Sequence, residues 1–216
     1  LYPEFGSSLG YQEFDSLGVN PSQKLEVAEI ILLKSWRKRL RSEIAVVNSK
    51  NLRVDLLILL DKVETDLKWK DVDDKLGTIP FYSSSQSVYN SLFQLINDQS
   101  PQKRKEAAVE RFKHYMSDYN KKNIIDGYLD EMARYEAKYK NKKKFYPFKG
   151  AVEQYLSDSS SYISGVKELL EKTGRKDWKK DYKKFQEKIE SYDNFLKTKF
   201  LSKTRKTPNY PLDVYK

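Results

Sequence analysis

The chain has 216 residues, no cysteine, one histidine and a net charge of +10. This length allows one large domain or two small ones, and the lack of cysteine excludes disulfides and thiolate metal sites. The longest apolar runs, 30–33 and 56–60, fall far short of the ~18 residues of a membrane span.

The positive charge is concentrated in one half of the chain. Residues 1–100 hold 12 Lys or Arg against 14 Asp or Glu, whereas residues 101–216 hold 29 against 17. Such asymmetry is typical of a polyanion-binding surface, and more often of a solvated helical face in a lysine-rich protein. The chain opens at Leu1 without Met or a visible signal peptide and stops in NYPLDVYK. We therefore expect both ends to be cuts in a longer protein.

The stretch FGSSLG, residues 5–10, matches the Gly-x-Ser-x-Gly pattern of a hydrolase nucleophile elbow. That elbow needs a buried strand before the serine, and a histidine and an acid that converge on it. Only five residues precede the motif, Pro3 is one of them, and the single histidine, His114, lies in a lysine-rich helical pattern. We therefore expect a plain Gly/Ser turn, with no catalytic role for Ser8 or His114.

Apolar residues recur at three- and four-residue spacing along almost the whole chain. This predicts an all-α fold, a bundle of about six to seven antiparallel amphipathic helices without significant sheet. The first helix, 21–47, is expected to be capped by Asn20 or Ser22, with Pro21 in its first turn. Its apolar stripe consists of Leu25, Ala28, Leu32, Trp36, Leu40, Ile44 and Val47.

The second helix, 52–75, should pack antiparallel to the first, because only a short break at 48–51 separates them. Its expected buried residues are Leu52, Leu56, Leu59, Leu60, Val63 and Leu67. After a loop at 76–84, we expect helices over 85–97, from Pro101 with Ser100 as N-cap to about Tyr139, over 151–172 and over 176–201.

We expect residues 1–216 to form one helical region. The alternative is a boundary between two sub-regions at the 140–150 linker. The stretch 120–123 either breaks or bends its helix, and Gly174 is expected to end the helix before it. On the last helix, Trp178, Tyr182, Phe185, Ile189, Tyr192 and Leu196 form one stripe.

Two compositional features admit both a binding and a structural interpretation. The 16 tyrosines could line a ligand cleft, but we expect them to fill helix boundaries with their hydroxyls in water. The basic-aromatic stretch 138–149, KYKNKKKFYPFK, fits nucleic acid, an anionic membrane, or an exposed loop whose rings pack back onto the helices.

The sequence offers no set of catalytic, cofactor-binding or metal-binding residues. One histidine cannot supply the histidine pair of a zinc hydrolase, and no Gly-x-x-x-x-Gly-Lys phosphate loop is present. The acidic cluster 71–75, DVDDK, lacks the ligand spacing of a calcium loop and is expected to solvate a helix end. We therefore assign no catalytic, cofactor or metal residue.

The order of four stretches resembles that of a known family. They are YPEFGSSLGYQEFDS (2–16), NLRVDLLILLDKVETDLKWKD (51–71), IPFYSSSQSVYNSLFQL (79–95) and SPQKRKEAAVERFKHY (100–115). Together they resemble the N-terminal helical region of the bacterial domain of unknown function eight-eight-five family. In that family a proline and a glycine turn open the fold, so Gly10 would be the turn glycine. Beyond residue 115 the resemblance rests on helix order alone.

The resemblance implies a larger protein than this chain. Family members look like zinc peptidases with a helical cleft, carry a His-Glu and a Pro-Gly-His motif in the C-terminal half, and often have export or lipoprotein signals. This chain would then be a non-catalytic N-terminal portion that shapes a substrate cleft. Its partners would be the C-terminal catalytic half, which would hold the zinc, and a peptide substrate, in a periplasmic, lipoprotein or cell-surface setting.

The alternative function is a stand-alone basic helical module that binds a polyanion. The charge on residues 101–216 and the stretch 138–149 favour it. Its ligand would be nucleic acid or an anionic membrane surface; among the partners of this chain as a whole, we do not expect nucleic acid.

Overall fold

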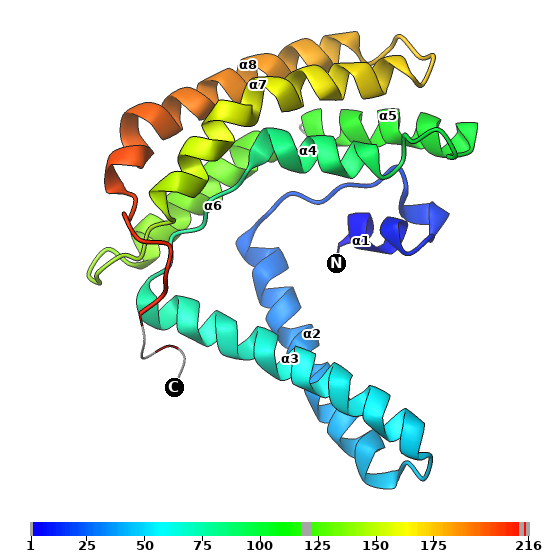
Figure 1. The fold of residues 1–216 in the computed structure, drawn as a ribbon, viewed down its shortest axis with the longest axis vertical. Coiled ribbons are helices and arrows are strands. Elements are labelled where there is room, and N and C mark those ends of the chain that lie inside the picture. The colour runs from blue at the N-terminus through cyan, green and yellow to red at the C-terminus, as the bar shows by residue number, and fades with distance from the viewer. Residues whose placement is uncertain (1, 118–121, 212–213, 215–216) are drawn as a thin grey trace.

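The computed structural model describes residues 2–117, 122–211 and 214, and these fold into helices (Figure 1). The α-helices are α1 Pro3–Ser8, α2 Gln23–Val46, α3 Lys50–Leu76, α4 Ser84–Phe93, α5 Gln102–Met116, α6 Ile124–Lys138, α7 Lys149–Glu171 and α8 Lys179–Phe195. The described residues contain no strand, only isolated bridges that join Thr78 to Phe145 and Phe148 to Arg205. The all-α prediction is confirmed.

Helices α2 and α3 form a long antiparallel hairpin, which we call the arm, and it projects from the remaining helices (Figure 1). Ser22 caps α2, because its Oγ accepts the backbone N–H of Leu25 at 3.2 Å. The sequence had indicated that Pro21 lies in the first turn, but it lies before the helix. Gly77 ends α3 with a φ of 67°, a left-handed conformation that favours glycine.

The apolar stripes predicted for the arm are mostly not buried, so that expectation is wrong. Of the α2 stripe, only Leu40 and Ile44 are buried. None of the 27 residues of α3 is buried, and Leu52 and Leu59 are 48% and 54% exposed. The physical reason is that each helix of the arm has one main neighbour, which covers only a narrow seam of an apolar face.

Helices α4 to α8 enclose the hydrophobic core. Helix α4 packs on α5 and α7, and α8 packs on α5, α6 and α7. All six residues of the stripe predicted for the last helix are buried, which confirms that prediction. The core draws on both sides of the 140–150 segment, with Tyr139 before it and Val152 after it.

Several helix ends differ from the predicted ones. Helix α4 stops at Phe93, and Pro101 precedes α5 as its N-cap, so Ser100 does not cap that helix. Asn123 caps α6 by accepting the N–H of Asp126 at 3.0 Å, which separates α5 from α6; residues 118–121 lie outside the described residues. After α8 the chain continues through a π-helical turn, Leu196–Phe200, and a 3₁₀ turn, Leu201–Lys203.

The opening segment contains a short helix, α1, where we expected only a turn. Packing and backbone conformation explain why glycine occupies both glycine positions of the FGSSLG stretch. A Cβ on Gly6 would lie 2.5 Å from the Phe14 ring, and Gly10 has a φ of 95°. This opening segment, residues 2–22, is fixed to helices α4 to α8, which we call the body. Arg104 of α5 makes the contact, because its Nε donates to Asp15 at 2.8 Å.

Candidate ligand-binding cavity

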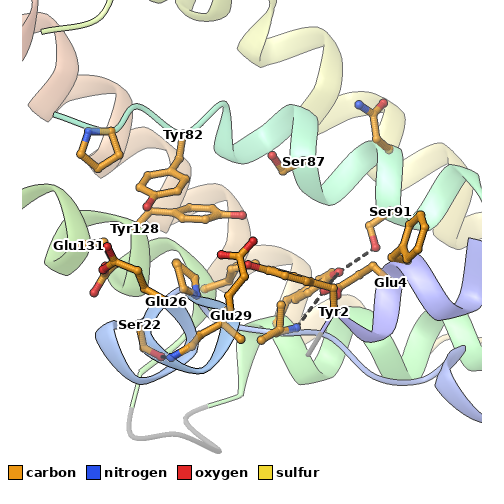
Figure 2. A pocket seen from close by; sticks show the side chains of 18 of the residues that line it. Tyr2, Glu4, Ser22, Glu26, Glu29, Tyr82, Ser87, Ser91, Tyr128 and Glu131 are labelled. Carbon is orange, nitrogen blue, oxygen red and sulfur yellow. Dashed lines mark hydrogen bonds between the residues drawn. The ribbon is translucent and has the colours of Figure 1, made fainter. Parts of the chain in front are cut away.

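A cavity of about 670 Å³ lies where the opening segment, the base of the arm and helices α4 to α6 meet (Figure 2). This volume lies within the usual range of small-molecule sites. Aromatic and acidic side chains are prominent in its lining. They are Tyr2, Tyr82, Tyr115, Tyr128 and Tyr135, with Glu4, Glu26, Glu29 and Glu131.

Arg134 holds two of these carboxylates together at one end of the cavity. Its Nη2 donates to Glu131 at 2.6 Å, one turn earlier on α6, and to Glu26 of α2 at 2.5 Å. The Tyr135 hydroxyl donates to the other oxygen of Glu26 at 2.7 Å. Burial opposes ionisation of Glu26, but the hydrogen bonds from Tyr135 and Arg134 lower its pKa below the ordinary value. Glu26 is therefore a fixed anion at neutral pH.

Glu29 also lines the cavity, one turn after Glu26 on α2 (Figure 2). Lys70 of α3 donates to its Oε2 at 2.7 Å. Burial and the neighbouring Glu29 carboxylate raise the pKa of Tyr2 to about 12, so this phenol stays protonated. Lys70 is the only lysine or arginine among the described lining residues.

A chain of polar groups fixes the opposite end of the cavity. The Tyr115 hydroxyl donates to Glu4 at 2.9 Å, and the Val19 N–H donates to the same oxygen at 2.8 Å. Tyr115 also contacts the Ser91 hydroxyl at 2.7 Å, which in turn lies 3.1 Å from Nη1 of Arg111. Arg111 is fully buried, and burial lowers the pKa of its guanidinium. These hydrogen bonds fix the position of the Glu4 carboxylate in the cavity wall.

Two stacked tyrosines form part of the cavity wall. The rings of Tyr82 and Tyr128 lie 4.4 Å apart with an interplanar angle of 16° (Figure 2). Burial raises the pKa of both hydroxyls, so both remain neutral phenols. The Tyr192 hydroxyl donates to the Tyr82 carbonyl at 2.7 Å and ties this wall to α8. The rings present an aromatic face next to carboxylates.

The electrostatic balance of the cavity is acidic. Its described lining carries four carboxylates and one ammonium group, a net charge of −3. Arg134 and the buried Arg111 stand behind the wall and reduce this to −1. The acidic groups project from the opening segment, α2 and α6, so folding alone brings them together.

The serine and the histidine that the sequence analysis considered occupy different parts of the structure. Ser8 lies at the edge of the cavity, but it is the last residue of α1 and its Oγ donates to the Phe5 carbonyl at 2.7 Å. His114 is half-buried on α5 and does not belong to the described lining. The described residues also contain no group of three His, Cys, Asp or Glu that could hold a metal ion.

The acidic cluster 71–75 links the arm to the body. Asp74 accepts from Lys138 at 2.7 Å and from the Tyr139 hydroxyl at 3.1 Å. Acidic groups are unfavourable at the C-terminal end of a helix, and Lys138 compensates this charge. The cluster was expected to solvate a helix end, and the structure adds this contact with α6.

The aromatic residues of 138–149 pack inward, as the third interpretation of that stretch expected. Phe145, Tyr146 and Phe148 are half-buried, and Tyr146 contacts the Phe200 ring at a centroid distance of 5.7 Å. The Arg205 guanidinium lies 4.5 Å from the Phe145 ring centroid. The rings of Phe145 and Tyr146 therefore pack against other side chains of the protein.

The tyrosines do not, in general, leave their hydroxyls in water, and that expectation is wrong. Besides the cavity residues, the hydroxyls of Tyr146 and Tyr162 bond to Glu136 and Gln86. The cleft interpretation, which we weighed less, describes five of the 16 tyrosines. Each ring supplies apolar area, and the hydroxyls of four of the five have a partner on another element: Tyr2, Tyr115, Tyr128 and Tyr135.

The residues that form the acidic end were not found by sequence reasoning. Glu131 and Arg134 have an i, i+3 spacing that favours an ion pair, but such pairs are common on helix surfaces. Nothing in the sequence indicates that Glu26, 108 positions before Arg134, joins them.

Comparisons of the chain with family models, with curated proteins and with solved structures found no match. The resemblance to the peptidase-like family stays a prediction. Within the described residues, every helix is too short or too polar to cross a membrane.

Proposed function

We propose that this chain is a non-catalytic binding module that holds an organic cation, such as a primary amine or the basic side chain of a peptide, in the cavity. The observation that carries the proposal is the described lining, in which four carboxylates oppose one ammonium group beside stacked tyrosine rings. A cavity of this volume and composition suits a ligand with an apolar stem and a positively charged head.

The chemistry of the wall favours an ammonium or guanidinium group over an anion. Ionised carboxylates only accept hydrogen bonds, and an ammonium group offers three donors. Charge-assisted bonds of this kind are roughly twice as strong as neutral ones. Tyrosine faces add cation–π attraction, which grows when the cation is desolvated. Glu29 is the acceptor we test, because a carboxylate offers about four lone-pair sites and its two donors, Lys70 and Tyr2, use only part of them.

A role in shaping the substrate cleft of a zinc-dependent, peptidase-like hydrolase is compatible with this proposal. It rests on the family resemblance, and the zinc and the catalytic groups would come from a C-terminal half. Capture of a basic peptide side chain by the Glu26–Glu29–Glu131 end would then position a peptide. Reading the gene past Lys216 tests this part: a continuation without a His-Glu metal signature rejects it.

One observation favours polyanion binding as a second candidate. A smaller hollow between the 143–146 loop and the 203–211 segment is lined by Lys143, Lys144, Lys203 and Arg205, without a carboxylate among its described residues. Such binding must weaken steeply as salt rises. Titration with single-stranded DNA, duplex DNA and anionic vesicles tests it, and no binding at low salt rejects it.

The cation proposal is tested by calorimetric titration with 1,5-diaminopentane and, as an uncharged match, 1,5-pentanediol. The expected result is binding of the diamine and none of the diol at equal concentration. Glu29→Gln should weaken diamine binding about 10- to 100-fold, the loss of one charge-assisted hydrogen bond. Glu153→Gln removes the same charge from an exposed i, i+4 pair outside the described lining and should have little effect. Equal effects of the two variants would reject the site.

A further inference from the structure

The arm exposes an unusual share of apolar surface. Eleven of the seventeen exposed large hydrophobic side chains of the described residues lie on it. They are Val27, Ile31, Leu32, Trp36, Val46, Leu52, Val54, Leu57, Ile58, Leu59 and Trp69. Exposed apolar side chains gathered on one element in this number favour an interaction site over a solvated face.

Part of this surface continues the seam between α2 and α3. Residues 52, 56, 59 and 63 follow the i, i+4, i+7, i+11 spacing of a coiled-coil face, yet Leu52 and Leu59 are about half exposed. On α2, Leu32 and Trp36 precede the buried Leu40 in steps of four residues and are 44% and 43% exposed. The apolar stripes are therefore wider than one neighbouring helix can cover.

We propose that the arm pairs with the arm of a second copy of this chain, so that two hairpins form an intermolecular four-helix bundle. Leu32, Trp36, Leu52 and Leu59 then supply its additional core. Four-helix bundles bury wide apolar stripes of this kind, because each helix has two neighbours.

The free part of the arm is large enough for a specific interface. Beyond the residues at its base, α2 runs from residue 30 to Val46 and α3 from Lys50 to residue 69, about 25–30 Å at 1.5 Å per residue. Two helices about 10 Å apart give a face roughly 20 Å wide. The product, about 500–600 Å² on each copy, reaches the ~1,000 Å² in total that a specific interface requires.

The charges of the arm favour pairing with itself. Helix α2 carries six basic and three acidic residues, a net +3, whereas α3 carries six basic and seven acidic residues, a net −1. In a bundle where α2 of one copy lies beside α3 of the other, the helices attract. A membrane surface would instead favour a helix with a strongly basic polar face, and α3 lacks one.

Sedimentation equilibrium of the full chain, from about 1 to 100 µM, tests the proposal. We expect a species of twice the 25.5 kDa chain mass. Leu59→Glu places a carboxylate in the proposed interface and should raise the dimer dissociation constant about 100-fold or more. The matched variant Ile58→Glu lies about 100° around α3 from Leu59, off the stripe formed by residues 52, 56, 59 and 63, and should leave the dimer intact. Circular dichroism of both variants shows that the helices persist.

Three results would overturn the inference. One is a monomer at every concentration, whether or not the arm binds vesicles or another protein. Another is a dimer that Leu59→Glu leaves unchanged, and the third is equal loss of the dimer in both variants with helicity retained. The cavity lies at the base of the arm, so amine titration of a Leu59→Glu monomer separates failure of this inference from failure of the proposed function.

Discussion

Arg134 is the residue whose removal should disturb the cavity most, and Arg134→Met is the informative change. Methionine retains much of the apolar stem and removes the guanidinium that contacts Glu26 and Glu131. The two carboxylates then face each other without a shared cation. Tyr135 still donates to Glu26, so the geometry of that side chain is partly kept.

The magnitude follows from burial. Breaking a fully buried ion pair costs about 3–5 kcal/mol, and an exposed pair contributes about 1 kcal/mol or less. The side chains of Arg134, Glu26 and Glu131 are 24%, 25% and 9% exposed, so the network lies nearer the buried limit. We expect Arg134→Met to lower the free energy of unfolding by about 2–3 kcal/mol at pH 7.

The pH dependence provides an internal check. In the native chain the pKa of Glu26 lies below its ordinary value of 4.5, so its stabilising contribution is present above pH 4.5 and is lost as pH falls through the lowered pKa. In Arg134→Met burial remains and the arginine hydrogen bonds do not, so the pKa of Glu26 rises. The difference in stability between the two proteins should therefore shrink on acidification.

Urea unfolding of both proteins at pH 7 and near pH 4, followed by circular dichroism, measures these differences. The double variant Arg134→Met/Glu131→Gln is the control, and it should recover part of the loss at pH 7 because one unpaired carboxylate is removed. A loss below about 0.5 kcal/mol at pH 7, or a loss that grows on acidification, would refute the reasoning.

Three further predictions concern stability and can be measured by the same unfolding assay. Gly18→Ala should destabilise the protein by about 1–3 kcal/mol, because the new Cβ would lie 2.2 Å from the Tyr115 ring. Gly127→Ala, inside α6 with its nearest neighbour at 3.6 Å, should be neutral or stabilise by up to about 1 kcal/mol. A greater loss of stability in Gly127→Ala than in Gly18→Ala would contradict the packing. Phe185→Ala should cost about 3–5 kcal/mol, because this ring is fully buried against Phe112, and a cost under 1 kcal/mol would place it outside the core. Asn123→Ala should cost about 1 kcal/mol through loss of the α6 cap, and an unchanged midpoint would show that the cap is dispensable.

The helices could be predicted from the sequence where each apolar stripe meets several neighbours. From Trp178, the N-cap of α8, to Leu196, its C-cap, buried residues repeat at helical spacing, and α5, α6 and α7 all pack on that helix. The same spacing on α3 predicted burial of Leu59 and was wrong. Periodicity reports which face is apolar, but it does not report how many elements cover that face.

The cavity could not be predicted, because its groups are local in space and distant in the sequence. Glu26 and Arg134 are 108 positions apart, and Glu4 and Tyr115 are 111 positions apart. Each is an ordinary helix or loop residue on its own. Only the docking of the opening segment and of α2 against α4 and α6 turns scattered tyrosines and glutamates into one wall.

The position of 1,5-diaminopentane in a crystal of the chain grown with the diamine is the most direct measurement of what the cavity binds. We predict an amine nitrogen about 2.7–3.2 Å from an oxygen of Glu29, Glu26 or Glu131, with the carbon stem against Tyr82 and Tyr128. An empty cavity at saturating diamine, or a diamine bound elsewhere on the chain, would contradict the account.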